Sequence, residues 1–328
     1  MRSARVSKAA FRRPGVAARL AGGALWGGAS VGLLVTLLGW LSRWSWQLGL
    51  LEHFRVQIAV AALLVTVAAA VARRLGPAAL AALAVMLNVA AIAPTWFSPE
   101  RPTHHGEPLS LLVLNVQEDN RDHARVARFL AGSDADIVGL LEMDSRWVHD
   151  LEPTMAAWPY RMPQPHDKDK FGLALYSRRP FRFREVRTFG VSLTPAIVAT
   201  IEMDGAPVTL VLVHPAPPVS SQMAEVQRRF LDALADARPT LGEHVVVMGD
   251  MNATPWSYPL RRLRARTGLA DSRRGFGLET SWPTATAALR IPIDHVLVSP
   301  RIVVLERAVG PAVGSDHFPV QAQIALVR

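Results

Sequence analysis

The sequence predicts an α/β domain with two packed β-sheets, preceded by N-terminal transmembrane helices. Residues 21–97 contain three long apolar runs without the charged face of a soluble helix. From residue 109 onward, short apolar runs alternate with turns and a few amphipathic stretches, which is typical of a two-layer α/β domain. One apolar run, Val245-Val246-Val247-Met248, ends abruptly in Gly249-Asp250-Met251-Asn252, which suggests a polar site where a buried strand reaches the surface.

The charge of the chain is concentrated at its N-terminus. Residues 1–100 hold ten of the 36 Lys and Arg residues, six of them before residue 20, and two of the 27 acidic residues. The remainder of the chain is therefore close to neutral, and the high isoelectric point does not indicate a nucleic-acid-binding face. The chain contains no cysteine, which excludes disulfides, thiolate zinc sites and cysteine nucleophiles.

The apolar runs at residues 21–41, 56–72 and 77–97 each approach the length that a membrane-spanning helix requires. Tryptophans cluster near their ends, where amphipathic rings favour the membrane interface. A cleaved signal peptide is an alternative for the first run, but its apolar part is too long and two further runs follow. A helical bundle in water is a second alternative, and the absence of a polar face argues against it.

The basic residues predict the orientation of this membrane region. Residues 1–20 form a basic tail, which the positive-inside rule places in the cytoplasm. Three spans then place the rest of the chain in the periplasm, as a multi-pass protein of the inner membrane. Arg73 and Arg74 fit this orientation, whereas Arg43 and Arg55 count against it. Residues 98–108, with three prolines, are expected to form a linker to a domain at 109–328. The lipid bilayer is thus the expected partner, and no protein partner is implied.

The elements of the soluble domain follow from its hydrophobic pattern. Strands are expected at 111–116, 137–141, 172–177, 197–203, 208–213, 245–248, 295–299 and 320–326. Amphipathic helices are expected at 119–132 and 222–235. Several of these strands end in a polar residue, among them Asn115, Glu142 and His214.

The order of the polar motifs resembles the endonuclease/exonuclease/phosphatase superfamily, the DNase I-like proteins that include abasic endonucleases, neutral sphingomyelinases and inositol polyphosphate 5-phosphatases. The motifs are Leu114-Asn115-Val116, Ile137 to Glu142, Gly172 to Arg178, Leu212-Val213-His214, Gly249-Asp250-Met251-Asn252, Ile293-Asp294-His295 and Ser315-Asp316-His317. The resemblance covers residues 111–324 and is closest to bacterial membrane-anchored members. It implies a four-layer sandwich of two mixed sheets flanked by helices, and hydrolysis of phosphoesters with Mg²⁺ or Mn²⁺.

The resemblance also implies a metal site. Glu142 would be the principal metal ligand, Asn115 would help to set the metal and the catalytic pair, and Asp316 would lie near the metal. Carboxylate and amide oxygens are the ligands that Mg²⁺ prefers, which is consistent with these roles. The alternatives are a solvated acid at the end of a strand and a turn-forming asparagine. Gln117 stands where several relatives carry a second acidic ligand, so a second metal is in doubt.

The remaining site residues are expected to act on the phosphate and on water. His317 would serve as a base or orient the phosphate, with Asp294 as the carboxylate that fixes its tautomer. By the same resemblance, Asp250 would orient the attacking water or protonate the leaving group, while Asn252 and His214 would contact the phosphate. A turn at Ser315-Asp316-His317 and a structural role for His214 are the alternatives. Trp282 could stack on a substrate or pack in the core.

These expectations predict a membrane-tethered, metal-dependent phosphoric ester hydrolase that cleaves phosphodiesters or phosphomonoesters by water attack assisted by a His–Asp pair. The substrate stays open between a phospholipid head group and nucleic acid. Arginines at helical spacing in residues 261–266 could contact a polyanion or form a solvated helix face. A non-catalytic, membrane-tethered binding module of the same fold is an alternative function. A transporter is disfavoured, because the apolar runs contain no charge.

Overall fold

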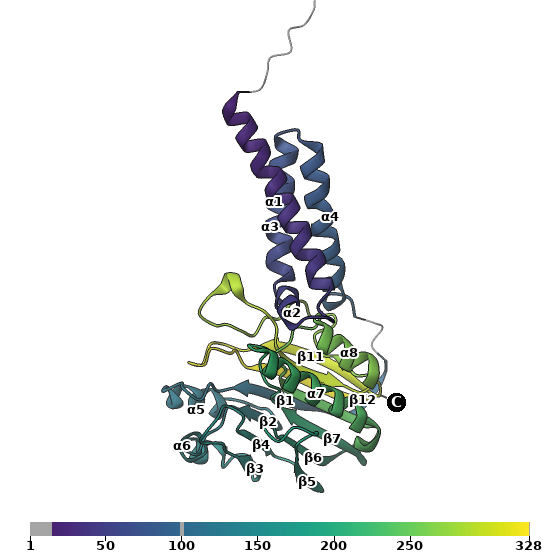
Figure 1. Ribbon diagram of the computed structural model, residues 1–328. Coiled ribbons are helices and arrows are strands. Elements are labelled where there is room, and N and C mark those ends of the chain that lie inside the picture. The colour runs from purple at the N-terminus through teal and green to yellow at the C-terminus, as the bar shows by residue number, and fades with distance from the viewer. Residues whose placement is uncertain (1–14, 99–101, 328) are drawn as a thin grey trace, which may run out of the picture.

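A helical stalk stands on a layered α/β domain (Figure 1). The computed structural model describes residues 15–98 and 102–327. The stalk consists of helices α1 (Val16–Trp40), α3 (Arg55–Val71) and α4 (Leu75–Ile92), with the short helix α2 (Trp46–His53) at its base. The α/β domain lies at the same end of the stalk as α2, opposite to the beginning of α1 (Figure 1).

The stalk agrees in outline with the three apolar runs predicted from the sequence. By length and composition, α1 and the segment Leu75–Thr95 could each cross a membrane. The pair formed by α2 and α3 could supply a third span, although it bends by 65° at its break. Helix α2 itself was not predicted, because polar residues such as Gln47, Glu52 and His53 interrupt its apolar pattern.

The domain contains two six-stranded mixed sheets, which confirms the predicted architecture. The first has the order β11-β12-β1-β2-β4-β3, with β1 and β2 parallel, and the second has the order β5-β6-β7-β8-β10-β9, with β7 and β8 parallel. The strands of the first sheet are β1 (His104–Asn115), β2 (Ile137–Leu141), β3 (Tyr160–Gln164), β4 (Leu173–Ser177), β11 (Ile302–Val309) and β12 (Val320–Val327). Those of the second are β5 (Phe183–Arg187), β6 (Ala196–Met203), β7 (Ala206–Val213), β8 (His244–Asp250), β9 (Ala270–Asp271) and β10 (Asp294–Val298).

The helices of the domain complete a four-layer sandwich. One apolar core lies between the two sheets, a second lies between the first sheet and helices α5 (His123–Ala131) and α6 (Ser145–Met155), and a third lies between the second sheet and helices α7 (Ser221–Ala237) and α8 (Tyr258–Thr267). Gly139 of β2 lies where the sheets approach most closely, because a Cβ there would lie 2.6 Å from Leu212 and 2.8 Å from Met248. The two sheets are thus packed directly face to face.

The stalk is docked onto the domain through buried polar contacts. The Glu52 carboxylate accepts hydrogen bonds from the Tyr258 backbone N–H (2.7 Å) and from Arg261 (3.2 Å), and its backbone oxygen accepts from the Trp256 indole (2.6 Å). Within the stalk the same carboxylate binds Arg55 at 3.2 Å, and both side chains are almost fully buried. At a second point the Thr95 carbonyl accepts from Gly275 (2.8 Å) and from the N–H of residue 277 (3.1 Å). The stalk and the domain therefore form one continuous structure.

Several boundaries differ from the sequence-based expectations. Strand β1 begins at His104, inside the segment 98–108 that was expected to be a linker, and it pairs with the C-terminal strand β12. Strands β3, β5, β9 and β11 and helix α6 were not predicted. Strands β3 and β5 lie at sheet edges and contain no fully buried residue, and their charged or proline residues interrupt the apolar pattern.

Candidate active site

The site is built where strands of both sheets end at the same edge of the sandwich. Asn115 is the last residue of β1, Glu142 follows β2, and Asp250 ends β8 of the other sheet. The Asn115 side-chain nitrogen donates to Glu142 Oε1 at 3.0 Å and to Asp250 Oδ2 at 3.3 Å. One amide group thus links carboxylates from two sheets, and the first three predicted residues lie together.

The backbone is strained at several of these positions. Glu142, Gln117 and Asn252 have positive φ angles of 59°, 60° and 47°, a conformation that costs a non-glycine residue about 1–3 kcal/mol. Gly249, immediately before Asp250, has φ 147°, and a Cβ there would lie 1.8 Å from the Val213 carbonyl oxygen. Glycine is therefore required for β8 to deliver Asp250 to the site.

A buried His–Asp pair lies beside this cluster. His317 Nδ1 lies 2.9 Å from Asp294 Oδ2, and His317 Nε2 faces Asp250 Oδ2 at 3.6 Å. The Ser315 hydroxyl holds the loop by donating to the Asn115 carbonyl at 2.6 Å and accepting from the His317 N–H at 3.0 Å. Burial alone would lower the pKa of His317, but the carboxylates of Asp294 and Asp250 outweigh it and raise this pKa to about 10.

His214 approaches the same carboxylate from β7. Its Nε2 lies 3.6 Å from Asp250 Oδ2, and its ring lies 5.6 Å from that of Phe171. Burial would raise the pKa of Asp250, but His317 and His214 together lower it. Among the described residues, two buried atoms of the site, His214 Nδ1 and Asp294 Oδ1, find no hydrogen-bond partner. Such atoms are suited to bind water or a ligand.

The last two predicted residues lie at the rim of the cluster. Asn252 is held in place because its side chain donates to the Pro215 carbonyl at 3.0 Å and its N–H donates to Asp250 Oδ1 at 2.8 Å. Asp316 is partly exposed, and its Oδ2 accepts from the Trp282 indole at 3.0 Å. Trp282 therefore orients a site residue, and it also lines the cavity above the cluster that is described below.

The residues present fit a divalent metal ion. Asp250, Asp294 and His317 offer ligand atoms that all lie within 4.8 Å of one another, and all three residues are buried. Carboxylate oxygens with one imidazole nitrogen suit a hard or borderline divalent ion. This group differs from the predicted ligands Asn115, Glu142 and Asp316. The resemblance of the motifs implied catalytic roles for Asp250, Asp294 and His317 and did not place them among the metal ligands. Glu142 remains adjacent, because Asn115 binds both it and Asp250.

The cavity above the cluster contains residues that the sequence did not indicate. It has a volume of about 610 Å³ and is lined by six predicted residues, namely Glu142, His214, Asp250, Asn252, Asp316 and His317. Lys170 also lines it, 3.9 Å from Glu142 Oε2. Leu50, His53 and Phe54 of the stalk form part of its wall. No motif contains these four residues, and the three stalk residues lie far along the chain from the motifs.

Other polar residues of the motifs serve the fold. His295 lies in a buried network, 3.3 Å from Asp271 Oδ2 and 3.2 Å from Arg273. Arg262 and Arg266 of α8 bind Asp232 of α7 at 2.8 and 2.7 Å. Together with the Arg261–Glu52 contact, these ion pairs show that the arginine run of α8 packs against protein carboxylates, a role that the sequence interpretation did not include.

The two-sheet sandwich and the cluster at its edge define a protein of the DNase I-like class. The chain belongs to the Endonuclease/Exonuclease/phosphatase family, which it matches over residues 112–317. Members of this family generally hydrolyse phosphoester bonds and depend on divalent metals. A search of curated proteins found no match to the sequence.

Solved structures support the fold. A family protein from Bacteroides thetaiotaomicron has 15% sequence identity and a TM-score of 0.58, with 69% of this chain and 100% of that chain covered. The D. rerio TDP2, solved in complex with a single-strand DNA product, has 17% identity and a TM-score of 0.57, with coverage of 66% and 99%. A family protein from Beutenbergia cavernae has 19% identity and a TM-score of 0.53, with coverage of 67% and 72%.

Proposed function

We propose that the chain is a membrane-anchored, divalent-metal-dependent phosphoesterase in which a His–Asp pair assists the attack of water on a phosphodiester or phosphomonoester. The observation that carries this proposal is the buried His317–Asp294 pair, which faces Asp250 on the floor of a cavity that also contains Glu142. The chain belongs to a family whose members generally hydrolyse phosphoesters, and this membership supports the same reaction for the cluster.

The geometry supports a role for each side chain. Asp250 accepts hydrogen bonds on both oxygens, which suits an ionised carboxylate that orients water. With Nδ1 bonded to Asp294, His317 keeps Nε2 for the water or for a phosphate oxygen. The water oxygen forms the new bond to phosphorus and its proton passes to the Asp250 carboxylate. The ester P–O bond breaks, and the leaving oxygen takes a proton from His317, which its raised pKa keeps protonated near neutral pH. A bound Mg²⁺ or Mn²⁺ would neutralise charge on the phosphate. His214 and Asn252 would contact phosphate oxygens.

The stalk supports the proposed membrane orientation. Arg73 and Arg74 lie at the turn between α3 and α4, at the end of the stalk away from the domain (Figure 1). Arg55, which counted against this orientation, is neutralised by Glu52. The positive-inside rule therefore favours a cytoplasmic N-terminal tail and a catalytic domain in the periplasm.

A nuclease is the second candidate function. The DNA-bound D. rerio TDP2 has the same fold, which favours this possibility. The arginines of α8 do not add to it, because they bind Asp232 and Glu52. A non-catalytic binding module would have no use for a buried His–Asp pair directed at a carboxylate.

The test uses the full chain in detergent micelles with the soluble diester bis-p-nitrophenyl phosphate. Release of p-nitrophenolate should require Mg²⁺ or Mn²⁺, stop with EDTA and be lost in Glu142→Gln. Glu152→Gln is a matched control, because Glu152 is an exposed glutamate of α6 outside the cavity. Metal-independent release, or full activity of Glu142→Gln, would contradict the proposal.

A further inference from the structure

The cavity above the catalytic cluster is lined by residues of two chemical kinds. The polar ones include Glu142, Asp250 and His317. The apolar ones include Leu50 and Phe54 of the stalk and residues 217–219 of the loop that precedes α7. The segment that could enter the membrane thus supplies a wall of the candidate active site.

Specific contacts hold this wall in position. Glu52 lies in sequence between Leu50 and His53, two of the three stalk residues that line the cavity, and it anchors α2 to the domain through Tyr258 and Arg261. His53 Nδ1 lies 3.3 Å from the Thr254 hydroxyl, close to the Asp250 loop. The apolar wall is therefore fixed relative to the catalytic cluster by buried groups on both sides.

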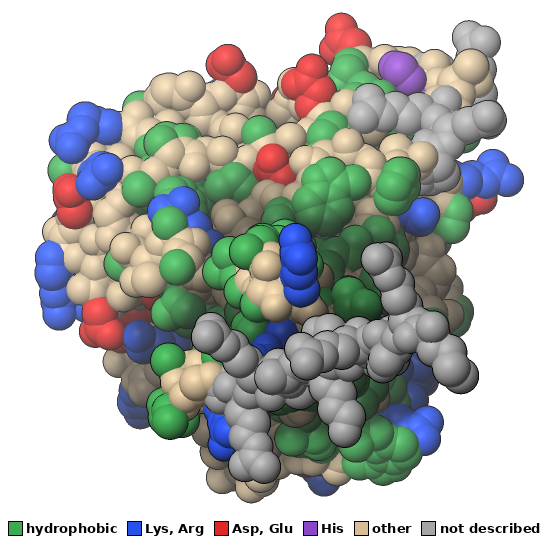
Figure 2. Space-filling view, turned by 90° about the horizontal axis from the view of Figure 1, so that it is seen from above, with side chains coloured by type: hydrophobic (Ala, Val, Ile, Leu, Met, Phe, Trp, Pro, Cys, Tyr) green, Lys and Arg blue, Asp and Glu red, His purple; other side chains and the backbone are tan. Residues whose placement is uncertain are grey.

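The apolar surface of the cavity extends to the membrane-facing side of the domain. Two apolar residues of the lining are exposed, Leu50 by 38% and Val219 by 71%. Helix α2 leads directly into α3, whose surface is apolar and exposed at Val60, Leu63 and Leu64. Seen along the stalk, many apolar side chains lie on and around the helices, while Asp and Glu side chains lie mainly towards the rim and a few Lys or Arg side chains lie on the stalk itself (Figure 2). The apolar surface of α3 and the apolar residues of the cavity thus belong to consecutive helices of the stalk.

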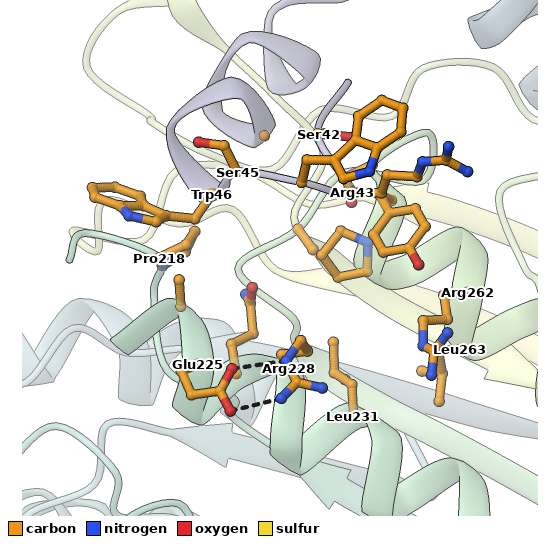
Figure 3. Close-up of a pocket in the computed structure, with 18 of the residues that line it drawn as sticks. Ser42, Arg43, Ser45, Trp46, Pro218, Glu225, Arg228, Leu231, Arg262 and Leu263 are labelled. Atoms are coloured by element: carbon orange, nitrogen blue, oxygen red, sulfur yellow. Dashed lines mark hydrogen bonds and ion pairs between the residues drawn. The ribbon is translucent and has the colours of Figure 1, made fainter. Parts of the chain in front are cut away.

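A second cavity on the other side of α2 provides a contrast. It has a volume of about 260 Å³, lies between the α1–α2 turn and helices α7 and α8, and shares His53 and Pro218 with the catalytic cavity (Figure 3). Several of its charged groups are paired with one another, as in the bidentate contact of Arg228 with Glu225 (Figure 3). This second cavity contains none of the predicted catalytic residues.

We infer that the substrate is an amphiphile: a phosphate ester whose hydrocarbon chain lies against Leu50, Phe54 and Val219 while its phosphate reaches Asp250 and His317. This inference rests on the proposed phosphoesterase function and names its substrate class. A nucleic acid fits this wall poorly, because it would place charged phosphates against apolar side chains. Among the described residues that line the cavity, Lys170 is the one Lys or Arg, and it already binds Asp119 at 3.1 Å.

The experiment compares two esters that differ in chain length. The full chain in detergent micelles is given methyl p-nitrophenyl phosphate or hexadecyl p-nitrophenyl phosphate, and kcat/KM is measured from p-nitrophenolate. The ratio of the hexadecyl to the methyl value should exceed ten. Leu50→Ser and Val219→Ser should each lower this ratio by about five- to tenfold, since each removes apolar contact with the chain. Both residues are exposed, so the substitutions should leave folding intact. Leu63→Ser is the matched control, because Leu63 is an exposed leucine of the stalk outside the cavity, and its ratio should equal that of the parent.

The outcomes separate the inference from the proposed function. Equal ratios in all four proteins, or an equal fall in Leu63→Ser, would overturn the inference while turnover of the methyl ester upholds the phosphoesterase. A single-stranded oligonucleotide cleaved with a higher kcat/KM than the hexadecyl ester would overturn the inference in favour of a nuclease. Absence of any turnover that depends on Glu142 would overturn both.

Discussion

Replacing Glu52 by alanine should release the stalk from the catalytic domain. The carboxylate is fully buried and binds Arg55 at 3.2 Å, the Tyr258 N–H at 2.7 Å and Arg261 at 3.2 Å. Removing it leaves the buried Arg55 guanidinium without its carboxylate, a change that typically costs about 3–5 kcal/mol. The contact with Arg261 adds at most about 1 kcal/mol, because that side chain is 41% exposed. For a domain of this size the total corresponds to a fall in Tm of about 10 °C.

Thermal unfolding of the full chain in detergent measures this effect. Arg261→Ala is the comparison variant, because it removes only the partly exposed partner of Glu52, and it should lower Tm by no more than about 3 °C. The double variant Glu52→Gln/Arg55→Met should recover most of the loss, because it removes the buried charge and keeps an acceptor for the Tyr258 N–H. If Glu52→Ala unfolds within about 3 °C of the parent, the buried pair does not hold the stalk as described.

Three further predictions concern the site. Asp294→Asn should lower kcat for the methyl ester by about 10²- to 10⁴-fold and also lower Tm at neutral pH, because it removes the carboxylate charge that orients His317 and raises its pKa; kinetics at parent level would exclude this role. In EDTA, the stability that protonated His317 supplies should be complete below its unfolded pKa of 6.5 and be lost as the pH rises towards its folded pKa of about 10. Tm should therefore fall over this pH range in the parent, and fall less in His317→Ala. Parallel curves of Tm against pH would contradict this pKa. Gly249→Ala should cost at least about 2 kcal/mol, because its Cβ would collide with the Val213 carbonyl, and an unchanged Tm would show that β8 can shift there.

The sequence predicted best the parts of the fold where buried strands end in polar residues. The runs before Asn115, Glu142 and Asp250 have strong apolar patterns, and the strands β1, β2 and β8 end close to the expected positions. The resemblance of the motifs then placed polar residues from separate segments in one site, and the structure brings them together around one cavity. Their individual roles remain proposals.

The sequence could not indicate contacts between distant segments. In the sequence, Leu50 and Phe54 look like ordinary apolar residues near the end of a membrane helix. Their position at the candidate active site depends on how α2 docks onto the α/β domain. The arginines of α8 illustrate the same limit, since their spacing suggested an open basic face whereas Asp232 and Glu52 bind three of them. Tertiary partners, which periodicity does not encode, decide the role of such residues.

The docking of α2 has a geometric consequence for the proposed catalysis at a membrane. Because Glu52 and Thr95 join the stalk to the domain, a stalk that spans the bilayer as proposed would hold His317 at a fixed distance from the membrane-spanning helices. Only phosphates that protrude from the bilayer to that position would then reach His317. A thinner or more sharply curved bilayer would change how far they protrude, so the proposal predicts a rate that depends on membrane thickness.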